Sequence, residues 1–134
     1  MNWSRVLTAG VVGGIVMTLA DWVMHGFIMG NAYRKYSDVF RQDEAGAHYF
    51  FLVGIMVALM AAILFGKTRS AWAAGAAGGA TFGFFLGLVA FFTNFYETLV
   101  IEGFPYHLSW CWGGINLISF TILGIVFGLI LKKE

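Results

Sequence analysis

Charge, cysteine and proline are all scarce in this sequence. Only 11% of its 134 residues are charged, against about 25% in an average soluble domain. The formal net charge of +1 gives no indication of a nucleic-acid partner. Cys111 is the single cysteine, which excludes a disulfide within the chain, and Pro105 is the single proline. This composition lies far from that of a soluble protein.

Long apolar runs make up most of the chain. Hydrophobic residues account for 60% of the sequence, and they form four runs, each close to the ~20 residues that cross a bilayer. The runs cover residues 6–30, 49–66, 71–94 (or to 101) and 108–131. We therefore predict a single all-α integral membrane domain over residues 1–134, an antiparallel bundle of four transmembrane helices that contacts the lipid bilayer. Four crossings leave no room for a soluble catalytic domain.

The basic residues predict how the bundle is oriented. In a four-span chain the first segment, the loop 67–70 and the tail lie on one side, and they hold five of the eight basic residues, including Arg5 and Lys133. The positive-inside rule therefore places both termini in the cytoplasm. No small-x-small cleavage site follows the first run, so we expect an uncleaved span rather than a secretion signal.

Glycine is abundant and regularly spaced, with 18 residues in the chain. Glycine costs about 1 kcal/mol relative to alanine inside a helix in water, but in a bilayer small residues let a second helix approach closely. Glycines four apart lie near one face of a helix. We predict that glycine-rich faces form the helix interfaces, through Gly10, Gly14, Gly54, Gly75, Gly79, Gly83, Gly87, Gly124 and Gly128.

Two further predictions concern the third run. The turn 66–70 is short, so the helices on either side of it are predicted to pack together as an antiparallel hairpin. The phenylalanines of the third run are predicted to face lipid or a partner, opposite the glycines. They are Phe82, Phe84, Phe85, Phe91 and Phe92.

Polar side chains gather toward the extracytoplasmic end of the predicted bundle. Asp21 and His25 lie one turn apart on the glycine face of the first run, and Glu97 continues the glycine face of the third. Ionisable groups at membrane depth usually face the bundle interior or a water-filled cavity. We therefore predict a polar cavity whose candidate lining residues are Asp21, His25, His48, Asn94, Glu97, Glu102, His107 and Asn116. The polar segment 31–47 before the second run reads as an amphipathic helix at the membrane surface or as a solvated loop.

Four interpretations of this cluster remain open. A metal site would use His25, His48, His107 and Glu97, although no HExxH or paired CxxC motif supports it. His25 beside Gly26 could instead bind a haem or another pigment. Asp21, His25 and Glu97 could conduct protons or ions. The same three side chains could simply form a buried network that fixes the register of the helices.

The layout resembles that of small, uncharacterised bacterial membrane proteins with four spans. The resemblance depends on Gly10, Gly13, Gly14, Asp21 and the His25–Gly26 pair in the first run, and on Trp110, Trp112, Gly113 and Gly114 in the last. It implies a bacterial inner membrane location and no particular activity or cofactor.

The sequence favours a non-catalytic protein, because it holds neither a catalytic motif nor a soluble domain. The first hypothesis is an accessory or structural subunit that packs against a larger membrane complex or against itself. The second is a small transporter that uses the polar cavity. The third is a membrane-embedded protein that binds a metal, haem or pigment.

Overall fold

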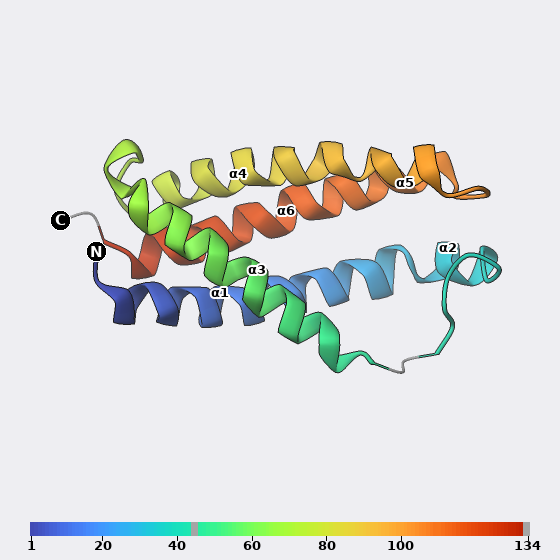
Figure 1. Cartoon of the computed structure of the whole chain (residues 1–134), viewed down its shortest axis with the longest axis horizontal. Coiled ribbons are helices and arrows are strands. Elements are labelled where there is room, and N and C mark those ends of the chain that lie inside the picture. The colour runs from blue at the N-terminus through green and yellow to red at the C-terminus, as the bar shows by residue number, and fades with distance from the viewer. Residues whose placement is uncertain (44–45, 133–134) are drawn as a thin grey trace.

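The structure is a computed structural model and describes residues 1–43 and 46–132. Within these residues the chain folds entirely as helices joined by turns and loops. Lys133 lies outside these residues, as do positions 44 and 45 of the predicted amphipathic segment. The helices are α1 (Trp3–Val23) with its π-helical continuation η1 (Met24–Ile28), α2 (Gly30–Lys35), α3 (His48–Lys67), the short 3₁₀ turn η2 (Arg69–Ala71), α4 (Gly75–Thr93), α5 (Phe95–Val100) and α6 (Tyr106–Ile130) (Figure 1).

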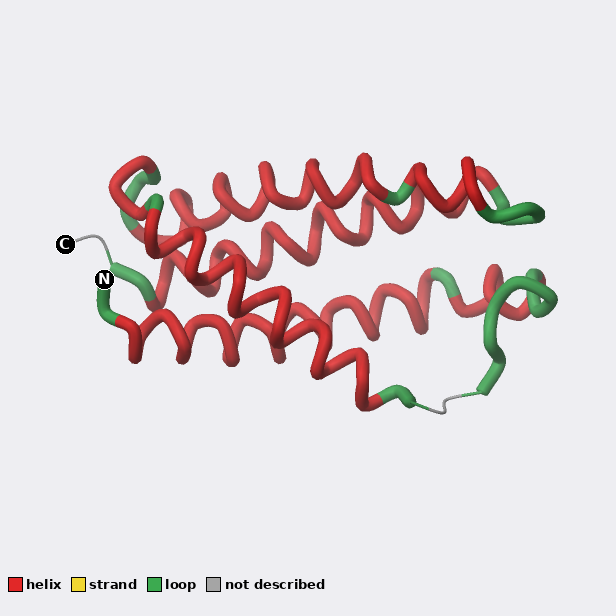
Figure 2. The backbone as a smooth tube through the Cα atoms, viewed as in Figure 1, coloured by secondary structure: helices red, strands yellow, loops and turns green. Residues whose placement is uncertain are grey.

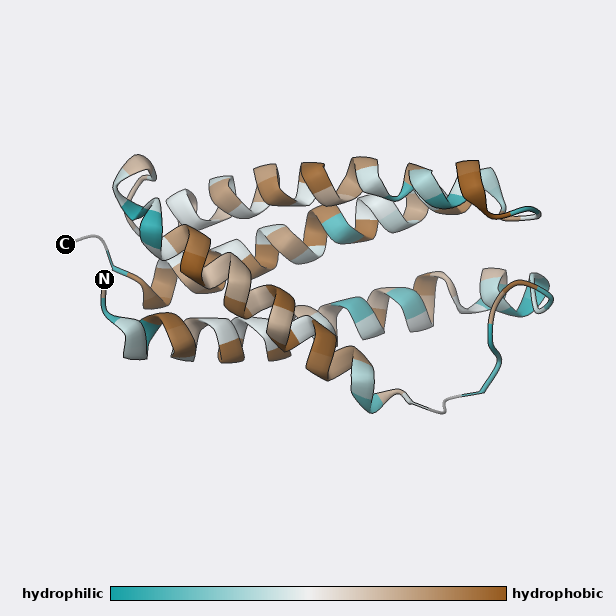
Figure 3. Cartoon of the chain, viewed as in Figure 1, coloured by the Kyte–Doolittle hydropathy of each residue, from teal (hydrophilic) through white to brown (hydrophobic). Residues whose placement is uncertain are grey.

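Four of these helical stretches are long and apolar enough to cross a membrane. They cover Trp3–Ile28, Ala47–Lys67, Gly75–Val100 and Tyr106–Ile130. Figure 3 shows brown, hydrophobic residues along all four, most densely in α3. The predicted fold, an all-α bundle of four membrane-span-like helices, is confirmed.

The bundle has two chemically different ends. The start of α1, the end of α6 and the turn between α3 and α4 lie at one end (Figure 1). We call it the basic end because Arg5, Lys67, Arg69 and Lys132 meet there around one cavity. The opposite end, which we call the distal end, holds α2 and the turn between α5 and α6. The three basic segments therefore share one end, as the orientation argument requires.

The closest helix pair is α4 with α6, and glycine makes it possible. A Cβ atom added to Gly87 would lie 2.9 Å from the Cα of Leu117, and one added to Gly79 or Gly83 would collide with backbone carbonyls of α6. The reverse holds for Gly124, where a Cβ would lie 2.8 Å from the Cα of Gly83. The helices run antiparallel with their backbones in contact, which maximises van der Waals packing in lipid.

A second antiparallel pair consists of α1 and α3. A Cβ on Gly14 would lie 2.7 Å from the Cα of Ile55, and a Cβ on Gly10 would lie 2.9 Å from the Cα of Leu59. Gly54 of α3 contacts α1 equally closely, because a Cβ there would collide with the hydroxyl of Thr18. Gly75 differs from the other predicted packing glycines. It starts α4 with a φ of +71°, which L side chains rarely adopt, while its carbonyl oxygen lies against Gly128.

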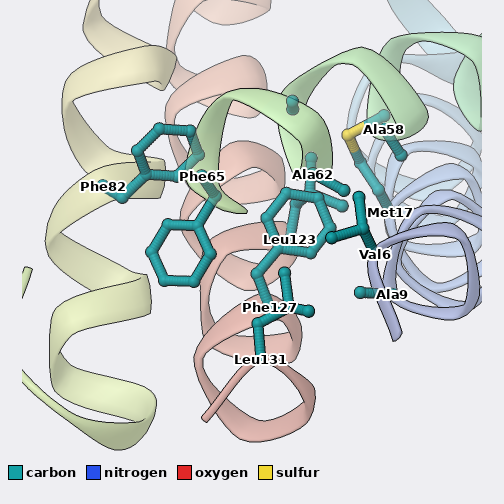
Figure 4. Packing of buried hydrophobic residues seen from close by; sticks show 11 residues of the cluster. Val6, Ala9, Met17, Ala58, Ala62, Phe65, Phe82, Leu123, Phe127 and Leu131 are labelled. Carbon is teal, nitrogen blue, oxygen red and sulfur yellow. The ribbon is translucent and has the colours of Figure 1, made fainter. Parts of the chain in front are cut away.

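The two pairs are joined through α1 and α6, and their main core lies toward the basic end. Phe65, Phe127, Leu123 and Val6 are almost completely buried there, and Figure 4 shows them converging from α1, α3 and α6. Phe82 of α4 joins the same core, with its ring centroid 5.0 Å from that of Phe65. The prediction that Phe82 faces lipid or a partner was therefore wrong, because its side chain points into the gap between α3 and α6.

The prediction that α3 and α4 pack together along their length as a hairpin was wrong. The two helices are antiparallel and consecutive, and Phe65 and Phe82 bring them together near the basic end. From there α3 crosses α1 at an angle, and its first residues lie well away from α4 and α6 (Figure 2). The reason is geometric: the glycine face of α4 is already occupied by α6.

Candidate functional site at the distal end

Asp21 of α1 lies at the start of the polar region and points at α6. Its Oδ1 atom accepts a hydrogen bond from the hydroxyl of Ser119, which is only 1% exposed. A carboxylate inside a bundle needs such a donor, because burial without a partner costs several kcal/mol. The contact joins residues 98 positions apart and fixes the register of α1 against α6. Asp21 therefore faces the bundle interior, as predicted.

One turn farther, His25 belongs to a short relay of three side chains. The indole Nε1 of Trp112 donates to the hydroxyl oxygen of Tyr33 at 2.7 Å, and that hydroxyl is hydrogen-bonded to Nδ1 of His25. An indole N–H can only donate, so the Tyr33 oxygen accepts from Trp112. Nδ1 of His25 is occupied by its contact with Tyr33, so Nε2 is the ring nitrogen that a metal or pigment would have to use.

Aromatic rings close the distal end over this relay. Tyr33, Phe40, Phe104 and Trp112 pack edge to face or tilted, with centroid distances between 5.0 and 6.4 Å. They form a second apolar core together with Met29 and other residues nearby. Burial raises the pKa of Tyr33 to about 12, against the lowering effect of the Trp112 hydrogen bond. The tyrosine therefore stays neutral at physiological pH.

Asn94 and Ser109 form a second polar contact, between α4 and α6. The amide of Asn94 donates to the carbonyl of Ala90 at 2.7 Å, and the Asn94 carbonyl accepts a 2.8 Å hydrogen bond from the hydroxyl of Ser109. Thr98 completes the group, with its hydroxyl 2.6 Å from that of Ser109. Because the side chain of Asn94 takes the Ala90 carbonyl, the helix is interrupted between α4 and α5.

The first and third spans both lose regular α-helical geometry at the depth of their polar residues. The π-helical turn η1 contains His25, and the break between α4 and α5 contains Asn94. Single π-helical turns often occur at functional sites because they reorient side chains. Here η1 coincides with the point where His25 reaches Tyr33 of α2. No pattern in the sequence predicted either irregularity.

The other predicted site residues do not join these contacts. His48 and Glu102 are exposed, and so is His107, whose ring lies 6.0 Å from that of Tyr36. Asn116 is partly buried, and no hydrogen bond from it is found within the described chain. Glu97 is partly buried, and its Oε2 atom has no hydrogen-bond partner among the described residues.

The proposed metal ligands His25, His48, His107 and Glu97 are not brought together. Within residues 1–43 and 46–132, no three His, Cys, Asp or Glu side chains lie close enough to hold one metal ion. In place of the predicted polar cavity, the described residues form hydrogen-bonded polar pairs, with the aromatic rings packed over the distal end. Neither of the two cavities described below is lined by a residue of the predicted polar set.

Four partners in the site were missed by sequence reasoning: Ser109, Ser119, Tyr33 and Trp112. Ser109 could have been found, because it lies on the same predicted face of the last run as Gly113 and Asn116. Tyr33 lies in the polar segment 31–47, which was read as an amphipathic helix or a loop. The segment contains both a short helix and a turn. α2 ends at Lys35, and the following turn brings Phe40 back onto Trp112.

Comparisons with known proteins add no assignment to this geometry. The chain matches none of the protein-family models, curated proteins or solved structures with which it was compared.

Proposed function

We propose that this protein is a non-catalytic structural or accessory subunit of a bacterial inner membrane, with both termini in the cytoplasm. It acts by binding a further transmembrane helix, from another subunit or from a second copy of itself. The observation that carries the proposal is an apolar groove between α3 and the α4–α6 pair.

The groove has the chemistry of a helix-binding surface. Its volume is about 460 Å³, and α3 is the least buried span, with 22% of its most apolar window buried against 39% in α1 and α6. Methionine adapts to irregular partners, and small residues allow close helix contact. The lining residues are Met56, Val57, Met60, Ala61 and Leu64 of α3, Leu86 of α4 and Phe120 of α6.

The polar groups support a structural role for the rest of the bundle. Asp21 is hydrogen-bonded to Ser119, and His25 is hydrogen-bonded to Tyr33. Two of the intramembrane polar side chains therefore have their hydrogen-bond partners within the chain. Toward the basic end the helices meet through glycine backbones and a core of apolar side chains. Such contacts hold the helices in fixed register.

Cysteine crosslinking in native membranes tests the proposal. In a Cys111→Ser background, one new cysteine is placed in the groove by Met60→Cys, and a matched control is placed outside it by Val89→Cys. The two positions are similarly exposed, at 57% and 64%. Val89 is also one helical turn from Leu86, so it lies at similar membrane depth. We expect a crosslinked product from Met60→Cys and little or none from Val89→Cys.

The size of the product identifies the partner. A product with the mass of two chains, containing both tags when two tagged forms are expressed together, indicates self-association. A product of another mass indicates a different subunit. Equal yields from both cysteines, or no product from Met60→Cys, would contradict the proposal.

A transport function is the second candidate, and it draws support from Glu97. A buried carboxyl oxygen without a hydrogen-bond partner is rare in proteins, and Oε2 of Glu97 is one. Intramembrane ionisable groups often mark ion or proton paths. Under this alternative, Glu97→Gln and Asp21→Asn each abolish flux in liposomes. Flux that both substitutions leave unchanged, for every ion tried, counts against it.

A further inference from the structure

A second cavity, unrelated to the groove, opens at the basic end of the bundle. Its volume is about 420 Å³. Four cationic side chains from four different segments line it: Arg5 of α1, Lys67 of α3, Arg69 of the turn and Lys132 after α6. No aspartate or glutamate of the described chain is among its lining residues. The cavity is therefore strongly positive.

Arg69 is held rigidly at this cavity. Its Nε atom donates to the carbonyl of Leu131 at 2.7 Å, and Nη1 donates to the carbonyls of Trp72 and Ala73 at 3.2 and 3.0 Å. Its guanidinium lies 5.1 Å from the ring centre of Phe65. Nη2 is buried and has no hydrogen-bond partner in the described residues. Neutral carbonyls do not cancel the charge of the guanidinium, which therefore adds to the positive potential of the cavity.

The lining of the cavity also contains apolar surface. Val6 and Leu131, both buried in the main core, contribute to its wall. The cavity therefore has an apolar wall on one side and carries positive charge on the other. Basic pockets between transmembrane helices are suited to anionic lipid head groups, and arginine matches phosphate geometry particularly well.

We infer that the cavity at the basic end binds the phosphate group of an anionic membrane lipid. Arg5, Lys67 and Lys132 supply the positive charge, and Arg69 supplies a fixed guanidinium beside them. The acyl chains continue along the apolar surface of the bundle. This inference does not depend on the proposed partner of the α3 groove.

Thermal unfolding of the full purified chain in a non-ionic detergent tests the inference. Phosphatidylglycerol is added in steps, because a ligand that binds the folded state raises the unfolding temperature in a saturable way. Phosphatidylcholine, which carries a compensating positive charge, is the lipid control. Glycerol 3-phosphate supplies the same phosphate chemistry in soluble form. We expect saturable stabilisation by phosphatidylglycerol and none by the other two.

Charge-removing variants locate the site. The double variant Arg5→Gln/Lys132→Gln leaves the hydrogen bonds of Arg69 intact. It should raise the half-saturating lipid concentration about 30-fold, at about fivefold for each basic residue near the surface. The matched control, Arg34→Gln/Lys35→Gln, removes two charges from α2 at the distal end and should leave that concentration unchanged.

Three results would overturn the inference. The first is stabilisation by phosphatidylcholine equal to that by phosphatidylglycerol, and the second is an equal loss of affinity in the distal control. The third is saturable stabilisation by glycerol 3-phosphate that the basic-end variant abolishes, because that result assigns the site to a soluble phosphate ester.

Discussion

The contact between α4 and α6 makes a sharp prediction about a single added methyl group. In Gly124→Ala, the new Cβ would lie 2.8 Å from both the Cα and the N of Gly83, where ordinary contact begins at 3.4 Å. These are backbone atoms, so no side chain can rotate away, and the two helices must separate. Overpacking of this kind costs about 1–3 kcal/mol. We expect Gly124→Ala to lower the free energy of unfolding by that amount.

The same helix provides the matched control. A Cβ on Gly114 would meet nothing within 4 Å, so Gly114→Ala adds a methyl group without a clash. Alanine is the better helix former by up to about 1 kcal/mol, and this variant should be neutral or stabilised. The free energy of unfolding is measured for both variants by equilibrium denaturation in mixed micelles, followed by circular dichroism.

The two variants should therefore change stability in opposite directions or by clearly different amounts. If Gly124→Ala is as stable as Gly114→Ala, the helix backbones are not in contact at this depth. The assignment of α6 as the partner of the glycine face of α4 would then be refuted.

Further predictions concern the distal site. Ser119→Ala should destabilise the bundle by about 1–3 kcal/mol, because it leaves the Asp21 carboxylate without its donor. Asp21→Asn keeps an acceptor for Ser119 and should destabilise the bundle less. Denaturation curves of the two variants test this order. Because the pKa of Tyr33 is about 12 in the folded protein and about 10 in an unfolded chain, its contribution to stability is complete below pH 10 and is lost as the pH rises toward 12. The loss should be absent in Tyr33→Phe. Trp112→Phe removes the hydrogen bond that lowers the pKa of Tyr33, so the phenolate absorbance of Tyr33, obtained by subtracting the Tyr33→Phe titration, should appear at still higher pH; an unchanged titration would contradict the relay.

The helices and their glycine faces could be predicted from sequence, but their pairing could not. Length and hydropathy define a span, and a stripe of glycine defines a face for close contact. Neither says which helix will occupy that face. Adjacency along the chain favoured α3 as the neighbour of α4. The structure pairs α4 with α6 because Gly124 and Gly128 let the two backbones touch, whereas α3 presents the large ring of Phe65 toward α4.

In the polar site, the orientation could be predicted for residues whose side chains are costly to expose to lipid. Asp21 and Asn94 had to turn inward because lipid offers them no hydrogen bonds, and both do so. Their neighbours Ser119 and Ser109 carry little such cost, because a serine hydroxyl can bond to its own helix. Helical periodicity placed Ser109 on the inward face of the last run, but nothing in the sequence marked Ser119. His48 and Glu102 lie near helix ends, where water is accessible, and helical periodicity does not determine which way such residues point.

The pairing of α1 with α6 has a consequence for how the protein is made. α6 follows α1 and α4 along the chain and is the neighbour that both need, so those two spans must wait in the bilayer with an unmatched face until it arrives. Chains that stop before α6 leave both faces open to other membrane proteins, and the quality-control proteases of the membrane should recognise them as unfinished.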